Sequence, residues 1–194
     1  RPHLRAMADV RDQGDCGSCW AFASATVLRA HSELQRGVDR TFSVQQLLAC
    51  TPNRLACGGE GGCRGATAEL AMQYVSRVGA VREEDFPYAS ADTGCPSELR
   101  VPKLTFKAAL LAKLQLSETG GGGARELGMT GWRKLPENRA GPLMLALAEQ
   151  GPVAVSVSAD GNWNLYGSGI MDACERDAVI NHAVVLVGYG AAGG

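Results

Sequence analysis

The sequence predicts an α+β protein, with helices in the first half of the chain and strands in the second. Apolar residues recur at helical spacing between glycine-rich loops in the first half. Short β-branched runs bounded by glycine and proline follow in the second half. The chain has 194 residues, 45% of them apolar, which is enough to bury a core. We expect one domain with two lobes, a helical lobe over about residues 10–100 and a β-rich lobe over about 101–194.

The first two helices are predicted from apolar spacing and from signals at their ends. Residues 19–36 place apolar side chains near one helical face, and Gly37 follows as a typical helix stop. Ser43 and Gln46 match a capping box, in which each side chain bonds the backbone N–H of the other residue. A short helix is therefore expected from this box to Cys50.

A third helix is predicted from Thr67 to Val78, with Glu69 in its positive first turn and Gly79 after its end. Its buried side chains are expected to be Leu70, Tyr74, Val75 and Val78. Four consecutive glycines, residues 120–123, then predict a flexible surface insertion between the two halves.

The second half is predicted to contain one helix and two strands. Residues 142–149 have the pattern of a helix that Gly151 and Pro152 bring to an end. Residues 153–157 and 183–189 are short runs rich in β-branched residues, so both are predicted as strands. The chain shows no internal repeat.

Charge and hydropathy exclude several classes of partner. The chain has 19 lysines and arginines against 20 aspartates and glutamates, a net charge of -1, and no basic run. This balance gives no electrostatic reason to expect nucleic acid or an anionic membrane. The longest apolar runs, such as residues 183–187, are too short to span a bilayer. We therefore expect a soluble protein without nucleic-acid or membrane partners.

The cysteine content points to an oxidising compartment or to metal binding. Seven cysteines in 194 residues are many for a reducing cytosol and typical of secreted or lysosome-like proteins. Two of them lie in the octet Gln-Gly-Asp-Cys-Gly-Ser-Cys-Trp, residues 13–20. The second, Cys19, stands where the first helix begins, and the positive end of a helix dipole favours a thiolate.

This octet, together with Asn181-His182-Ala183 before Gly-Tyr-Gly, resembles the papain family of cysteine proteases, of cathepsin L or B type. The resemblance implies a papain-like fold, with a helical lobe, a β-barrel-like lobe and the active site in the cleft between them. It implies Cys19 as nucleophile, His182 as general base and acid, and Gln13 as an oxyanion-hole donor. The implied reaction is hydrolysis of peptide bonds through a thioester, without a cofactor.

One partner that the family provides is not in this sequence. The family orients its histidine with an asparagine in an Asn-Ser-Trp-Gly segment after Gly-Tyr-Gly, whereas this sequence ends at Gly194. Asn181 immediately precedes the histidine and matches a different family position. We expect that the sequence is truncated; a catalytically weakened or inactive peptide-binding relative is the alternative.

The resemblance also implies two disulfides, Cys16 with Cys63 and Cys50 with Cys95. The pairing of Cys57 and Cys174 stays open. Two other readings of these cysteines can be stated. Cys16 and Cys19 form a CxxC that could be a thioredoxin-like redox pair, although no strand is expected before it. Cys16, Cys19, Cys57 and Cys63 have a spacing loosely compatible with zinc.

The family's substrate-binding positions fall on small residues. Gly65 and Ala66 match the glycine pair that hydrogen-bonds the substrate backbone, and the methyl of Ala66 is tolerable only at negative φ. The pocket for the second residue before the cleaved bond matches Thr67, Ala68, Ser156 and Ala183, with Asn181 next to it. We expect this pocket to prefer an apolar or aromatic residue.

The resemblance further implies a set of partners and a place in the cell. Expected partners are peptide or protein substrates and a propeptide or cystatin-like inhibitor. We expect a monomeric zymogen that is secreted or lysosomal or vacuolar, with signal peptide and propeptide outside this sequence.

Overall fold

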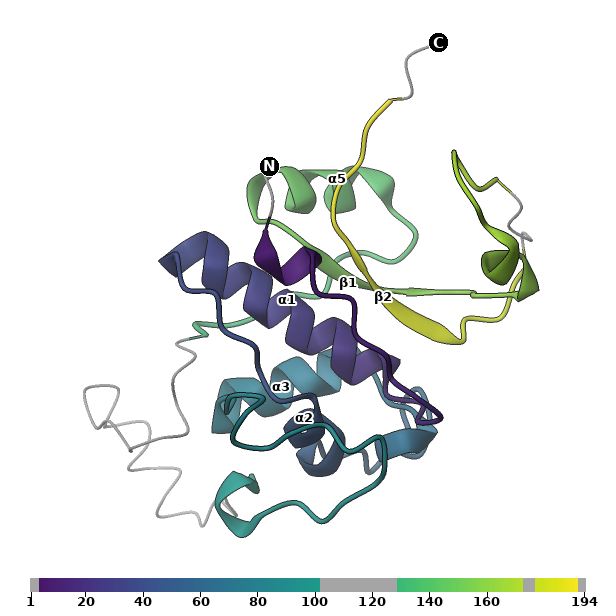
Figure 1. Cartoon of the computed structure of the whole chain (residues 1–194). Coiled ribbons are helices and arrows are strands. Elements are labelled where there is room, and N and C mark those ends of the chain that lie inside the picture. The colour runs from purple at the N-terminus through teal and green to yellow at the C-terminus, as the bar shows by residue number, and fades with distance from the viewer. Residues whose placement is uncertain (1–3, 102–128, 173–176, 192–194) are drawn as a thin grey trace.

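The computed structural model describes residues 4–101, 129–172 and 177–191, and it has α+β architecture (Figure 1). Three helices, α1 (Cys19–Arg36), α2 (Val44–Cys50) and α3 (Ala68–Val78), come first along the chain. A further helix, α5 (Ala140–Glu149), and two strands, β1 (Val153–Val157) and β2 (His182–Leu186), follow. The predicted glycine tract, residues 120–123, and Cys174 lie outside the described residues.

The ends of α1 follow the signals in the sequence. The helix begins at Cys19, directly after Ser18, and its 18 residues end before Gly37. Gly37 has φ +67°, the left-handed conformation that glycine adopts without strain, and its N–H donates to the Glu33 carbonyl. The prediction of this helix is confirmed at both ends.

Helix α2 forms only half of the predicted capping box. The Ser43 hydroxyl accepts a hydrogen bond from the Gln46 N–H at 2.9 Å, as expected. The Gln46 side chain does not return to the Ser43 N–H, which donates to the Val81 carbonyl instead. Gln46 is fully buried, and its amide binds Tyr74, Gly79 and Val81. This part of the prediction was wrong because the glutamine is used in tertiary contacts.

Helix α3 begins one residue later than predicted, at Ala68, ends before Gly79 as predicted, and has nearly the predicted buried face. The Thr67 hydroxyl accepts a hydrogen bond from the Leu70 N–H, and Gly79 ends the helix at φ +89°. Tyr74, Val75 and Val78 are buried, whereas Leu70 is only half-buried. The main core lies among α1, α2 and α3. It includes Trp20, Leu28, Phe42, Val44, Leu47, Leu48, Ala71, Tyr74, Val75 and Leu99.

The two strands form an antiparallel pair in which Val157 lies opposite His182 and Val153 opposite Leu186. Strand β2 was predicted to continue to Tyr189 but ends at Leu186. The next position on β1 is Pro152, which has no N–H to donate to a further ladder bond. Helix α5 begins two residues earlier than predicted, at Ala140.

The strand pair packs against α1, as Figure 1 shows. The His31 side chain on α1 donates from Nε2 to the Pro152 carbonyl at 2.9 Å, which fixes the start of β1 on the helix. Among the described residues, no helix has both the length and the apolar character needed to cross a membrane.

Candidate active site

Cys19 is the first residue of α1 and is half-buried. The first four N–H groups of a helix have no carbonyl partner one turn earlier, and together they carry the positive end of the helix dipole. The Cys19 N–H is one of these groups and has no partner within the helix.

The residues around Cys19 are tied to the segment that leads into Gly65. Cys16 and Cys63 form a disulfide, and the Gly17 N–H donates to the Cys63 carbonyl at 3.0 Å. Trp20 Nε1 donates to the Gly62 carbonyl at 3.3 Å. Gly17 has no room for a side chain, because a Cβ there would lie 2.5 Å from the Cys63 oxygen. Cys19 and the expected substrate-binding segment are therefore held in a fixed position relative to one another.

The second disulfide joins Cys50 and Cys95. Both bridges are the pairs that the family resemblance implies. Cys57 carries an exposed free thiol. Because Cys16 is bonded to Cys63, it provides neither a redox partner for Cys19 nor, with Cys63, thiolates for zinc. The segment before Cys16 contains no strand, unlike the βαβ unit that the redox reading requires.

Gln13 is hydrogen-bonded through both its side chain and its main chain. Its Nε2 donates to the Cys16 carbonyl at 2.9 Å, which holds the amide beside the loop that precedes Cys19. An amide nitrogen has two N–H groups, so a second donor remains. The Gln13 carbonyl accepts hydrogen bonds from the hydroxyls of Tyr88 and Ser90, at 2.7 and 2.9 Å. The sequence analysis did not single out these two residues, since no local motif connects positions so far apart.

His182 opens β2, is half-buried, and lies opposite Val157 in the sheet. His31, which contacts Pro152 at the Val153 end of the sheet, lies 12 residues after Cys19 on α1. At the rise of an α-helix, these 12 residues span about 18 Å. The strands run from the Val153 end to His182, about 13 Å. In Figure 1, α1 and β2 begin at the same end of their contact. Helix α1 and strand β2 pack against each other, and Cys19 and His182 are the first residues of these two elements.

Asn181 makes a structural contact just before His182. Its Oδ1 accepts from the Ala159 N–H at 2.8 Å, and its Nδ2 donates to the Ala159 carbonyl at 3.1 Å. Its own N–H donates to the Val157 carbonyl. These bonds fix the turn that leads into β2, and they engage the side chain away from the histidine that follows it.

The expected substrate-binding residues lie on two parts of the fold. Gly65 has φ +89°, whereas Ala66 is not among the described non-glycine residues with positive φ, which are Ala56, Ser90 and Asn138. The methyl of Ala66 therefore meets the condition set by the sequence.

The four pocket positions are placed as follows. Thr67 caps α3 and Ala68 is its first residue. Ser156 and Ala183 lie opposite one another across the sheet, one position from His182, and Ala183 packs against the helical core.

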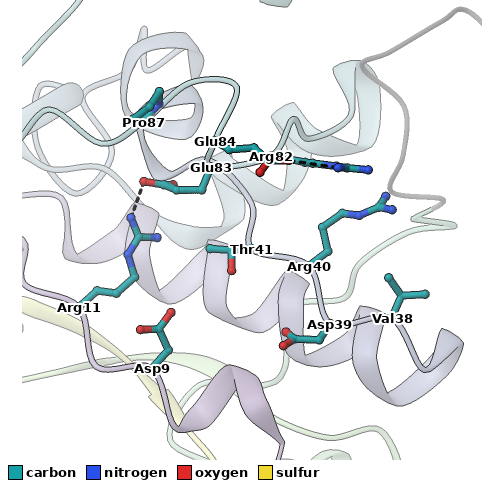
Figure 2. A pocket seen from close by; sticks show the side chains of 10 residues that line it. All are labelled: Asp9, Arg11, Val38, Asp39, Arg40, Thr41, Arg82, Glu83, Glu84 and Pro87. Carbon is teal, nitrogen blue, oxygen red and sulfur yellow. Dashed lines mark hydrogen bonds and ion pairs between the residues drawn. The ribbon is translucent and has the colours of Figure 1, made fainter.

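A hollow of about 720 Å³ lies elsewhere on the surface (Figure 2). Its lining residues are Asp9, Arg11, Val38, Asp39, Arg40, Thr41, Arg82, Glu83, Glu84 and Pro87. Most of its charges are paired: Arg11 with Glu83, Arg82 with Glu84, and the two aspartates with Arg29. This hollow contains neither Cys19 nor His182.

Curated proteins of an animal and a plant are similar to this chain in sequence. Cathepsin K of Mus musculus is 33% identical over 188 residues, which are 95% of this chain and 48% of that protein. The oryzain beta chain of Oryza sativa subsp. japonica is 30% identical over 187 residues, 95% of this chain and 34% of that protein. The chain thus spans about half the length or less of these curated relatives.

Two solved structures have folds similar to that of this chain. Digestive procathepsin L 3 of Tenebrio molitor matches with a TM-score of 0.71 and 26% identity, over 95% of this chain and 52% of that one. The bromelain protease from Ananas comosus matches with a TM-score of 0.69 and 28% identity, over 94% and 70%. The family model described as papain family cysteine protease matches residues 1–194. This chain therefore belongs to the papain family of cysteine proteases.

Proposed function

We propose that the protein is a cysteine-type endopeptidase in which Cys19 and His182 act as a thiolate and imidazolium pair. The observation that carries this proposal is the packing of β2 on α1, because Cys19 and His182 are the first residues of these two elements. The side-chain amide of Gln13, held beside the same loop, supports a place for the developing oxyanion.

The reaction proceeds in two steps. The Cys19 sulfur attacks the peptide carbonyl carbon, and the resulting oxyanion is bound by the Cys19 N–H and the Gln13 amide. The carbon–nitrogen bond breaks as the His182 imidazolium donates its proton to the leaving amine. Neutral His182 then takes a proton from water, whose oxygen attacks the thioester. Release of the carboxylic acid product returns the thiolate and the imidazolium.

The substrate is an extended peptide that pairs with the backbone at Gly65 and Ala66. Thr67, Ala68, Ser156 and Ala183 line the pocket for the second residue before the cleaved bond, next to Asn181. These side chains are small and uncharged, so the pocket accepts an apolar or aromatic residue better than a cation.

The working protein is a secreted or lysosomal or vacuolar monomer made as a zymogen. Two disulfides support an oxidising compartment. A propeptide, or a cystatin-like inhibitor, would occupy the same groove as the substrate.

Peptide hydrolysis by the full-length gene product tests the proposal. Cys19→Ser and His182→Ala are expected to lower kcat at least a thousandfold. Cys57→Ser is the matched control, because it removes an exposed free thiol outside the site and should leave kcat unchanged. Full activity in Cys19→Ser would overturn the assignment, and faster cleavage after an arginine-containing pair than after a phenylalanine-containing pair would overturn the pocket.

A further inference from the structure

We propose that Tyr88 is a positioning residue that sets the place of Gln13 relative to the start of α1. The inference rests on the proposed function and extends it to a residue remote in the sequence. The Tyr88 hydroxyl lies between two groups of the loop formed by residues 13–18. It donates to the Gln13 carbonyl at 2.7 Å and lies 2.6 Å from the Ser18 hydroxyl, which donates to it in turn. One hydroxyl thus joins both ends of the loop.

The Ser18 side chain does not make the hydrogen bond that is usual for a serine at the start of a helix. Serine at the position before a helix normally accepts a hydrogen bond from one of the first helical N–H groups. The Ser18 side chain makes no such cap, although it is completely buried. Its single hydroxyl proton goes to Tyr88 instead, and the Cys16 carbonyl oxygen lies 3.3 Å from the Ser18 hydroxyl oxygen. The N–H groups at the start of α1, that of Cys19 included, are thereby left without a side-chain acceptor.

Neighbouring residues hold both the backbone and the ring of Tyr88. Its N–H donates to Glu83 Oε1 at 2.9 Å, and the same carboxylate accepts from Arg11, as the dashed line in Figure 2 marks. The second oxygen of Glu83 accepts from the N–H of Val44, the first residue of α2. The Tyr88 ring meets the Phe22 ring of α1 edge-on, with centroids 4.8 Å apart. The hydroxyl therefore has a fixed position relative to both α1 and α2.

Ser90 strengthens the hold on the same carbonyl. Its hydroxyl donates to the Gln13 oxygen at 2.9 Å, so that this oxygen accepts two bonds. Ser90 has φ +53°, a left-handed conformation that few non-glycine residues adopt, and its cost must be met by surrounding contacts. The Gln13 carbonyl is thus bound by Ser90, which has a strained backbone, and by Tyr88, whose hydroxyl in turn accepts from Ser18.

The chemical consequence concerns the transition state. An oxyanion donor acts only within hydrogen-bond distance of the developing charge, and a displacement of about 1 Å can cost a hundredfold in rate. Tyr88 makes no contact with the reacting atoms. It acts through Gln13, and its loss should lower kcat while leaving KM and the reactivity of the thiolate unchanged.

A double-mutant cycle in the full-length gene product tests this coupling. Tyr88→Phe should lower kcat for peptide hydrolysis about tenfold, and Gln13→Ala about a hundredfold. The double variant should be no slower than Gln13→Ala, because Tyr88 has nothing left to position. Alkylation of Cys19 by iodoacetamide forms no oxyanion, so its rate should stay at the wild-type value in Tyr88→Phe. Tyr166→Phe is the matched control, since its hydroxyl binds only Gly169 among the described residues.

Ser18→Ala removes the other hydrogen bond of the Tyr88 hydroxyl. This variant tests the same proposal if Tyr88→Phe does not fold. It should lower kcat without further loss when combined with Gln13→Ala. Three outcomes would overturn the positioning role. In the first, the losses in kcat of the single variants multiply in the double variants. In the others, kcat is unchanged in both single variants, or alkylation of Cys19 slows together with kcat. A wild-type protein without Cys19-dependent hydrolysis would overturn the proposed function as well, whereas active protein with independent Tyr88 and Gln13 effects overturns only this inference.

Discussion

Gln13 is held in place by hydrogen bonds of both its side chain and its main chain. One N–H of its amide is used by the Cys16 carbonyl, and its own carbonyl is held by two hydroxyls. These hydrogen bonds are part-buried or exposed, and the residue is half-buried. Its contribution is therefore expected to be to the reaction rather than to folding.

Substitution of Gln13 should separate these two contributions. Gln13→Ala removes the proposed oxyanion donor, which is worth about 3 kcal/mol in the transition state, or about a hundredfold in kcat. The free energy of unfolding should change by less than about 1 kcal/mol, since one partly exposed hydrogen bond is lost. Steady-state kinetics and urea unfolding measure both. Unfolding of the variant at the assay temperature, or wild-type kcat, would contradict this account.

Tyr74 is the residue whose ionisation responds most to burial. It is 2% exposed, donates to the Leu99 carbonyl and accepts from Gln46. Burial raises the pKa of Tyr74 to about 12, although the hydrogen bond from Gln46 acts in the opposite direction. The folded state therefore resists loss of this proton more than the unfolded chain does.

The sign of the resulting pH effect follows from this difference. Stability due to neutral Tyr74 is fully present below the ordinary tyrosine pKa of about 10 and is lost as pH rises toward about 12. Tyrosinate absorbance should show a component that titrates near 12 in the wild type and is missing in Tyr74→Phe. An identical late component in the two proteins would exclude Tyr74 as its source.

At the scale of elements, the two disulfides provide a natural comparison. They close loops of nearly equal length, with sequence separations of 47 for Cys16–Cys63 and 45 for Cys50–Cys95. The chain-entropy model assigns about 4 kcal/mol to each. Only the first joins the loop before Cys19 to the segment that leads into Gly65.

Removal of each bridge should therefore have the same effect on stability and different effects on activity. The double serine variants at Cys16 and Cys63, and at Cys50 and Cys95, should each lose about 4 kcal/mol of unfolding free energy. Below their melting temperatures, only the first should show a lowered kcat. Denaturant unfolding and kinetics at low temperature measure the difference, and equal losses of kcat would show that the bridges act on the site only through stability.

Across the whole molecule, Arg29 on α1 joins two other segments of the chain. Its guanidinium forms two hydrogen bonds with Asp39, at 2.6 and 3.2 Å, and a third with Asp9 in the N-terminal segment. The hydrogen bonds from Arg29 lower the pKa of Asp39 below its usual value. The same pairing raises the pKa of Arg29.

This ion pair predicts an acid-dependent contribution to stability. Because the pKa of Asp39 is lower in the folded state, its contribution is complete above the unfolded value of about 3.9 and is lost as pH falls through the folded value. Asp39→Asn should cost about 1 kcal/mol at neutral pH and nothing near pH 2. Thermal unfolding against pH checks this, and a difference in stability that persists at pH 2 would contradict it.

The parts of the fold that the sequence predicts are those that depend on neighbouring residues. The C-terminal end of α1 follows from the cap glycine at Gly37, and β1 follows from its β-branched run directly after Gly151 and Pro152. In the candidate site, Cys19 and Gln13 lie in one motif, and the resemblance of that motif to the family predicts their roles. The disulfide partners were available only through the family resemblance.

The remaining features depend on contacts between distant segments and leave no local pattern. Gln46 has a capping sequence, yet its burial against Tyr74 and Val81 decides its bonding. Strand β2 stops where Pro152 lies on the neighbouring strand. Tyr88 meets Gln13 across 75 residues. Such effects require the packed structure, because each one is set by a partner that the sequence does not place nearby.

The central claim is that Cys19 is a thiolate activated by His182, and selective labelling tests it most directly. Near pH 5.5 an ordinary thiol is protonated and reacts slowly with an epoxide. Cys57, an exposed free thiol, serves as the internal control. The account predicts one-to-one labelling of Cys19 with loss of peptidase activity, negligible labelling of Cys57, and no selective labelling in His182→Ala. Equal labelling of the two cysteines, or selective labelling of Cys19 that survives in His182→Ala, would contradict it.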